Sequence, residues 1–203
     1  MSIWNSIYYN FMQNGMAKPK RVFIIHGWGA LPENGWYQGV AADLRKQGFD
    51  AQVPAMPNTQ DPKPQEWIAK LNDVVGTPTT DDYFIGHSLG PTAIMLWLEQ
   101  LPKDAKIGGA LFVGGGFTYR PENMPDDLSQ DPWYHRLPDF KAIKPHCDRF
   151  VALVSDDDPI IVVADKDIFA NELGAEIVLE QGYGHYVYAK DAPRIVKAFS
   201  RVV

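Results

Sequence analysis

Short stretches rich in apolar and β-branched residues alternate along this chain with longer stretches in which apolar residues recur at helical spacing. The short stretches are typical of strands buried on both faces of a sheet, and they lie at 21–25, 50–54, 83–85, 110–113, 150–154 and 176–179. The longer stretches carry apolar residues three and four positions apart, which predicts helices at 36–46, 65–75, 89–101, 161–173 and 192–202. Strands and helices therefore follow one another in turn.

This alternation predicts an α/β fold in which helices cover both faces of a mainly parallel sheet. Strands joined by right-handed helical crossovers form a three-layer, doubly wound sandwich, here with a six-stranded sheet. We expect one such domain over residues 20–203, because a chain of 203 residues suits a single hydrophobic core. Residues 1–19 precede the first strand and are predicted to form a tail or a docking segment.

One connection is much longer than the others. The segment from about 115 to 144 lies between the fourth and fifth predicted strands and is rich in prolines and aromatic residues. Connections of this length inside a compact domain are usually functional, so we interpret the segment as a lid or a pocket wall. The alternative is an ordered loop that is packed by its own aromatic side chains.

The sequence Gly86-His87-Ser88-Leu89-Gly90 lies directly between a predicted strand and a predicted helix. A G-x-S-x-G motif in this context is typical of a nucleophile elbow, a sharp turn that keeps a serine in a strained backbone conformation. The two glycines allow the strand and the helix to approach closely, because they carry no side chain. Ser88 is therefore the candidate nucleophile.

A serine hydroxyl is a weak nucleophile at neutral pH and needs a base, which in turn needs an acid to orient it. In the elbow architecture the order along the chain is serine, acid, histidine. His185 has the expected place, since it follows the last predicted strand behind Gly182 and Gly184. The acid is expected after the fifth strand, where Asp158 is the first candidate and Asp157 the second. The alternative for this run of aspartates is a solvated loop that caps the next helix.

The oxyanion that develops during acyl transfer needs backbone N–H donors. One donor is expected from Leu89, the residue after the nucleophile, and the other from the loop after the first strand. That loop reads His26-Gly27-Trp28-Gly29, and we predict that Trp28 supplies the second donor. The alternative interpretation of this loop is an ordinary tight turn between a strand and a helix.

Several aromatic residues are candidates for an apolar substrate pocket, although aromatic side chains more often belong to the core. The candidates are Trp36, Tyr119, Trp133 and Tyr186, in addition to Trp28. No metal-ligand spacing and no glycine-rich nucleotide-binding motif is visible, so we predict neither a metal nor a cofactor. The run 114–116 consists of three glycines with no lysine after it, and we interpret it as a flexible strand exit.

Charge and composition limit the classes of partner. A formal net charge of −6 disfavours nucleic acid or an anionic membrane surface as the main partner. No apolar run approaches the length of a membrane span, so no membrane insertion is expected. The chain has one cysteine, Cys147, which excludes an internal disulfide, and its first residues show no secretory-signal pattern. We therefore expect a cytoplasmic protein that acts on a small-molecule substrate.

With these motifs in this order, the chain resembles the α/β-hydrolase superfamily. The Gly-His-Ser turn, Asp157-Asp158-Pro159 and Gly184-His185 are similar to those of the small serine hydrolases typified by retinoblastoma-binding protein 9 and its bacterial relatives. The resemblance covers about residues 20–203 and implies a compact six-stranded sheet in which Asp158 is the catalytic acid. The Leu-x-Cys-x-Glu segment for which the founding member is named is missing here, so its protein partner is not transferred.

The function predicted from these residues is a serine hydrolase, specifically a carboxylesterase that acts on a small ester. Ser88 would form an acyl-enzyme, His185 would move the proton, and Asp158 would orient His185. Two other functions are compatible with the same residues. One is an acyltransferase or thioesterase, and the other is a non-catalytic binding or regulatory module that has kept the fold.

Overall fold

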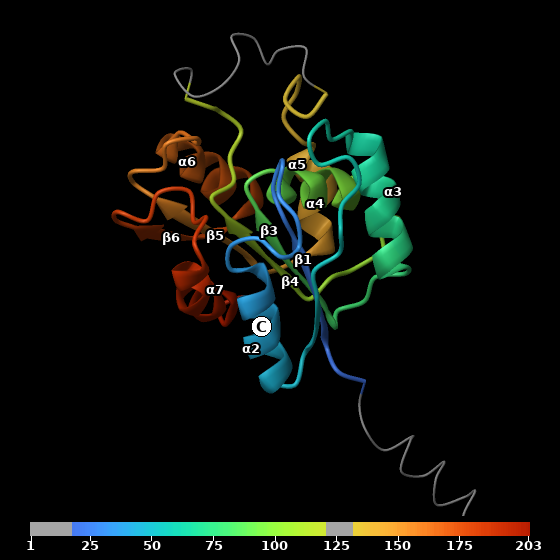
Figure 1. Cartoon of the computed structure of the whole chain (residues 1–203). Coiled ribbons are helices and arrows are strands. Elements are labelled where there is room, and N and C mark those ends of the chain that lie inside the picture. Colours follow the sequence, from blue (N-terminus) through green and yellow to red (C-terminus); the bar gives the residue numbers. More distant parts are fainter. Residues whose placement is uncertain (1–17, 121–131) are drawn as a thin grey trace, which may run out of the picture.

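The computed structural model describes residues 18–120 and 132–203. Its centre is a six-stranded sheet in the order β2-β1-β3-β4-β5-β6, and every neighbouring pair is parallel (Figure 1). The strands are β1 (Arg21–Ile25), β2 (Asp50–Gln52), β3 (Asp82–His87), β4 (Gly109–Val113), β5 (Phe150–Ser155) and β6 (Glu176–Glu180). The predicted doubly wound α/β architecture is therefore confirmed.

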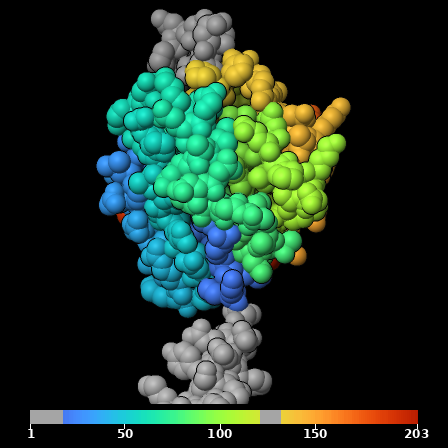
Figure 2. Space-filling model, turned by 90° about the vertical axis from the view of Figure 1, so that its right-hand side faces the viewer, coloured from blue at the N-terminus to red at the C-terminus, as the bar shows by residue number. Residues whose placement is uncertain are grey.

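Helices cover both faces of the sheet. On one face lie α2 (Tyr37–Lys46) and α7 (Ala192–Phe199), and on the other lie α3 (Pro64–Val75), α4 (Gly90–Leu98) and the short α5 (Phe140–Ile143) (Figure 1). Figure 2 looks onto the second face, where the segment around α3 occupies the centre of the surface. Short 3-10 turns at Lys144–His146 and Ala189–Asp191 precede β5 and α7.

The two apolar layers are built from alternate residues of the strands, because successive side chains of a strand point to opposite faces. In β1, Val22 and Ile24 pack into the layer under α2 and α7. Phe23 and Ile25 pack into the layer under α3 and α4. Both faces of the sheet are thus buried, which explains why the strands are nearly continuous apolar runs rather than alternating ones.

The segment 161–173, predicted as one helix, is the main departure from the sequence-based assignment. Ile161 forms an antiparallel bridge with Tyr119, and the Val162 N–H donates to the Thr118 carbonyl at 3.0 Å, so the chain is still extended there. Helical turns begin only afterwards, as a 3-10 turn at Val163–Asp165, α6 at Lys166–Ile168 and a π turn at Phe169–Leu173. Pairing with the 118–120 segment has overridden a helical pattern whose β-branched residues favour extended backbone.

Two predicted segments fall largely outside the described residues, namely the tail at 1–19 and the middle of the predicted lid at 115–144. The flanks of the second segment are fixed to the body of the domain. The Asp165 carboxylate accepts the N–H groups of Phe117 and Thr118 at 2.6 Å each, and the Trp133 indole donates to the Pro62 carbonyl at 2.9 Å. Its role as a lid or pocket wall stays a prediction.

Within residues 18–120 and 132–203, none of the helices combines the length and the apolar character needed to cross a membrane. The expected cytoplasmic location stays a prediction.

Candidate active site

The predicted site residues come from four separate loops that meet at one edge of the sheet. Ser88 follows β3, Asp158 follows β5, His185 follows β6 and Trp28 follows β1. All four strands are parallel, so their carboxyl ends lie side by side, and this is where open α/β sheets bind ligands. Residues up to 157 positions apart in the chain are thereby brought into one neighbourhood.

Ser88 sits in a sharp turn that has a glycine two residues away on each side. Its φ is +58°, a left-handed backbone conformation that is rare for a residue with a side chain. A Cβ added to Gly86 would lie 2.5 Å from the Pro91 nitrogen, and one added to Gly90 would collide with the Ile25 carbonyl oxygen. The sequence therefore forms a sharp strand-to-helix turn, with the serine at its apex, as the G-x-S-x-G pattern predicts.

Ser88, His185 and Asp158 lie in series within hydrogen-bonding distance. His185 Nδ1 is 2.9 and 3.1 Å from the two carboxylate oxygens of Asp158, and its Nε2 is 2.8 Å from Ser88 Oγ. A carboxylate only accepts, so in the neutral ring Nδ1 carries the proton and Nε2 accepts from the Ser88 hydroxyl. A general base for Ser88 requires this tautomer.

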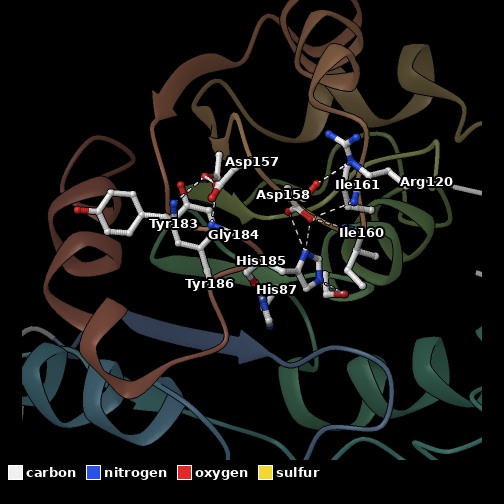
Figure 3. A network of polar contacts seen from close by, with 12 residues as sticks. His87, Arg120, Asp157, Asp158, Ile160, Ile161, Tyr183, Gly184, His185 and Tyr186 are labelled. Carbon is white, nitrogen blue, oxygen red and sulfur yellow. Dashed lines mark hydrogen bonds and ion pairs between the residues drawn. The ribbon is translucent and has the colours of Figure 1, made fainter. Parts of the chain in front are cut away.

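The two candidate acids have different partners, as Figure 3 shows. Asp158 is buried, with 3% of its surface exposed, and its carboxylate also accepts the N–H groups of Ile160 and Ile161 at 2.8 and 3.0 Å. These two N–H groups precede the first helical turn after β5, so Asp158 binds the backbone of its own loop and does not cap a helix. Asp157 points instead to the backbone of Gly184, so only Asp158 contacts the His185 ring among these two.

The residues before Asp158 bind the backbone of the histidine loop. The Asp156 carboxylate accepts the Gly182 N–H at 3.1 Å, the Ser155 hydroxyl accepts the Tyr183 N–H at 3.0 Å, and the Asp157 carboxylate accepts the Gly184 N–H at 2.8 Å. Two hydrogen bonds lower the pKa of Asp157. The one from the Ser155 hydroxyl has the larger effect, and the one from the Gly184 N–H has the second largest. Four consecutive side chains, 155–158, thus contact four consecutive residues, 182–185.

The two amides predicted for the oxyanion are available. Among the residues that the structure describes, neither the Trp28 N–H nor the Leu89 N–H donates to a protein acceptor, whereas the Gly29 N–H donates to Thr59 at 2.7 Å. A Cβ on Gly27 would lie 2.8 Å from the Ser88 Cβ, so this position must lack a side chain for the loop to approach the nucleophile.

His26 anchors the same loop. Its Nε2 accepts the Met56 N–H at 3.2 Å, while its Nδ1 lies 3.1 Å from the Gly27 carbonyl. Burial lowers the pKa of His26, which favours the neutral ring that Nε2 needs in order to accept the Met56 N–H. This histidine therefore shapes the loop that carries the Trp28 amide.

A hollow of about 160 Å³ lies beside Ser88, between the 27–37 segment and the 185–187 loop. Trp28, Trp36, Tyr186 and Val187 are among the residues that line it, and of these Trp28 and Val187 are exposed. Two of the four aromatic residues predicted for a pocket, Trp36 and Tyr186, are thus adjacent to the serine.

The other two predicted pocket residues lie elsewhere. Trp133 is buried and packs edge-on against Trp67 at a ring distance of 5.5 Å, so it fills the layer next to α3. Tyr119 contacts Tyr134 with a ring distance of 4.6 Å and does not line the hollow. Both side chains are used for packing, which was the alternative for aromatic residues in general.

Some residues of the site were missed or misread from the sequence. Gly114, read as part of a flexible exit, has a φ of +53°, and a Cβ there would lie 3.4 Å from His185 Nδ1 and 3.5 Å from Asp158 Oδ2. It is a close-packing position beside the histidine–aspartate pair. The available signal was a glycine at the carboxyl end of the strand next to the elbow strand. Tyr37 and His87 carried no such signal in the sequence.

The buried His87 makes the stability of the protein sensitive to acid. Burial first, and then the neighbouring His185, lower the pKa of His87 from 6.5 to about 3. Between these two values the unfolded chain binds a proton at this residue and the folded chain does not, so the free energy of unfolding falls as the pH falls. From about pH 7.5 to about pH 5.5 we expect this residue to contribute a loss of about 1 kcal/mol.

Urea unfolding of the wild type and of His87→Gln at the two pH values checks this expectation. The variant keeps every other titratable group but lacks this one, so its loss on acidification should be smaller by about 1 kcal/mol. Equal losses in the two proteins would contradict the assignment.

A doubly wound sheet with a serine at a nucleophile elbow is the structure of an α/β hydrolase. A family model described as serine hydrolase matches residues 22–192, and the chain belongs to this family. The resemblance inferred from the motifs is therefore confirmed at the level of the superfamily and of the small serine hydrolases.

Individual relatives agree with this assignment. The YdeN protein of Bacillus subtilis is 30% identical over 169 residues, which are 83% of this chain and 86% of that protein. The crystal structure of the ydeN gene product has a TM-score of 0.81 at 26% identity and covers 90% of this chain and 98% of its own. Est1E from Butyrivibrio proteoclasticus has a TM-score of 0.67 at 18% identity, covering 94% and 90%, which shows a shared fold.

Proposed function

We propose that this hydrolase is a carboxylesterase that cleaves a small ester through an acyl-enzyme on Ser88. The observation that carries the proposal is the continuous path from Asp158 through His185 to Ser88, with separations of 2.9 and 2.8 Å. It supports a hydroxyl nucleophile with a base in the correct tautomer and an acid behind that base.

In the proposed reaction, Ser88 Oγ attacks the ester carbonyl carbon while His185 Nε2 takes the hydroxyl proton. The oxyanion is stabilised by the N–H groups of Trp28 and Leu89, and Asp158 stabilises the imidazolium without taking a proton. His185 then donates its proton to the leaving alkoxide oxygen as the C–O bond breaks. In the second half, a water molecule gives a proton to His185 and attacks the acyl carbon, and the proton returns to Ser88 as the acid is released.

The hollow beside Ser88 supports a compact substrate. Its volume of about 160 Å³ is close to that of a cavity of about 150 Å³ known to hold benzene, so it accommodates about six non-hydrogen atoms. Its lining by Trp28, Trp36 and Val187 favours an apolar group rather than a charged one.

Hydrolysis of p-nitrophenyl acetate, butyrate, octanoate and decanoate tests the proposal. We expect the highest kcat/KM for acetate or butyrate and a fall of at least about tenfold for decanoate, because the longer chain exceeds the hollow. Folded protein that hydrolyses none of these esters would contradict the proposal. Faster cleavage of the matching thioester, or acyl transfer to an added alcohol in preference to water, would support the two enzymatic alternatives instead.

A further inference from the structure

Two buried residues outside the serine–histidine–aspartate series connect the nucleophile to the base. His87, the residue before Ser88, has its Nε2 at 2.8 Å from the backbone carbonyl oxygen of His185. Its Nδ1 is 2.6 Å from the hydroxyl of Tyr37, the first residue of α2. Both side chains are almost completely buried. The elbow, the loop that carries His185 (the base loop) and α2 are therefore linked by a series of hydrogen bonds.

The direction of each hydrogen bond follows from the chemistry of its partners. A carbonyl oxygen only accepts, so His87 Nε2 carries the proton and donates to His185. In the neutral ring Nδ1 must then accept, and the Tyr37 hydroxyl is its donor. The Tyr37 oxygen in turn lies 3.5 Å from the Gly27 nitrogen, a long contact with the loop that carries the oxyanion donors. Since both nitrogens of His87 are occupied, this ring is no rival base for Ser88.

Trp36, the residue directly before α2, binds the backbone carbonyl that follows that of His185. The Trp36 indole N–H donates to the backbone oxygen of Tyr186 at 2.7 Å. Two successive carbonyls, those of His185 and Tyr186, are thus anchored from this side by His87 and Trp36. The 155–157 side chains anchor the N–H groups of 182–184. Without His87, the backbone of His185 itself would have no hydrogen-bonded support among the contacts described.

We propose that Tyr37 and His87 are positioning residues that set the distance between the serine nucleophile and its base. His87 is joined to Ser88 by one peptide bond and to His185 by one hydrogen bond, so it sets the spacing between the two loops. Tyr37 fixes the His87 tautomer that can donate to His185. The inference rests on the proposed serine chemistry, in which a displacement of about 1 Å between reacting groups can cost about 10²-fold in rate.

Four single variants test the proposal. Tyr37→Phe removes only the hydroxyl, and His87→Leu removes both ring nitrogens. His87→Gln keeps an amide N–H near the position of Nε2 and can still donate to His185. Tyr83→Phe is the matched control, since its hydroxyl contacts Lys20 at the opposite end of β3. For each folded variant we would measure kcat and KM with p-nitrophenyl acetate, and the rate of Ser88 labelling by a fluorophosphonate probe.

Tyr37 and His87 border the hollow but are almost completely buried. We therefore expect the effect in kcat and in the labelling rate, with KM changed by less than about threefold, because these residues act mainly by placing the base. The kcat should fall about 10²-fold in His87→Leu and about tenfold in Tyr37→Phe. It should recover to within about fivefold of the wild type in His87→Gln and stay unchanged in Tyr83→Phe. The double variant Tyr37→Phe/His87→Leu should be no slower than His87→Leu, because Tyr37 acts through His87.

Several results would overturn the proposal. One is a wild-type kcat in folded His87→Leu, and another is an effect confined to KM. The proposal also fails if kcat falls equally in His87→Gln and His87→Leu, or if the losses in kcat are additive in the double variant. The labelling rate separates this inference from the proposed function. If the wild type is labelled at Ser88 but hydrolyses no ester, the esterase assignment fails and the same comparisons are made on labelling. If the wild type is not labelled at all, both proposals fail.

Discussion

Ser88→Ala is expected to abolish ester hydrolysis and fluorophosphonate labelling in a protein that still folds. The substitution removes the oxygen that forms the acyl-enzyme, while His185 and Asp158 remain paired at 2.9 Å. Loss of the nucleophile in serine enzymes lowers kcat by as much as about 10⁶-fold. Activity on p-nitrophenyl acetate should therefore fall below detection, and mass spectrometry should show no probe adduct.

Ser200→Ala is the matched control for this prediction. Its hydroxyl donates to the Lys197 carbonyl at the exposed end of α7, so its loss should change neither hydrolysis nor labelling. The melting temperature of Ser88→Ala should stay near that of the wild type, because alanine occupies the same turn with a smaller side chain. Hydrolysis at the wild-type rate in Ser88→Ala would mean that another residue is the nucleophile, and the proposed function would have to be abandoned.

Asp158→Asn is expected to lower kcat by about 10⁴-fold, the effect of the same change in a serine protease triad. The asparagine amide can donate to His185 Nδ1, which would then be an acceptor and would leave the ring proton on Nε2. A ring protonated at Nε2 cannot take the Ser88 proton. Binding of substrate does not depend on this proton, so KM should change much less than kcat.

Asp157→Asn is the adjacent comparison, because it makes the same chemical change one residue earlier. Asparagine keeps an oxygen that can accept the Gly184 N–H, which the carboxylate now accepts at 2.8 Å. We therefore expect a loss of about tenfold or less in kcat. Steady-state kinetics of the two variants with p-nitrophenyl acetate decide which of the two aspartates orients His185. A larger loss in Asp157→Asn would move the role of orienting acid to Asp157.

The order of elements and the turn around Ser88 could be read from the sequence because both depend on local patterns. Buried parallel strands are continuous apolar runs, and the helices between them have their own period, so each element is visible in a window of a few residues. The elbow motif is visible in five consecutive residues. Its requirement for Gly86 is local, since a Cβ there would meet Pro91, whereas a Cβ on Gly90 would meet the Ile25 carbonyl of β1. The place of His185 followed from the order of motifs along the chain.

Other features depend on contacts between distant segments. Whether 161–173 forms one helix was decided by pairing of Ile161 with Tyr119, a contact that no local period reveals. The same holds for the pocket candidates, since Trp133 packs on Trp67, while Trp36 reaches the Tyr186 carbonyl 150 positions away. Aromatic composition alone does not distinguish a packing role from a lining role.

By itself, then, the sequence determined the alternation of strands and helices, the turn that presents Ser88 and the loop that carries His185. Only the tertiary structure decided which of the consecutive aspartates meets the imidazole, and that Tyr37 and His87 connect α2 to the base loop. The physical reason is that hydrophobic period and turn geometry act between near neighbours in the chain. Hydrogen bonds such as those of His185 with Asp158 and Ser88 join residues 27 and 97 positions apart, and their partners are selected by the packing of the whole sheet.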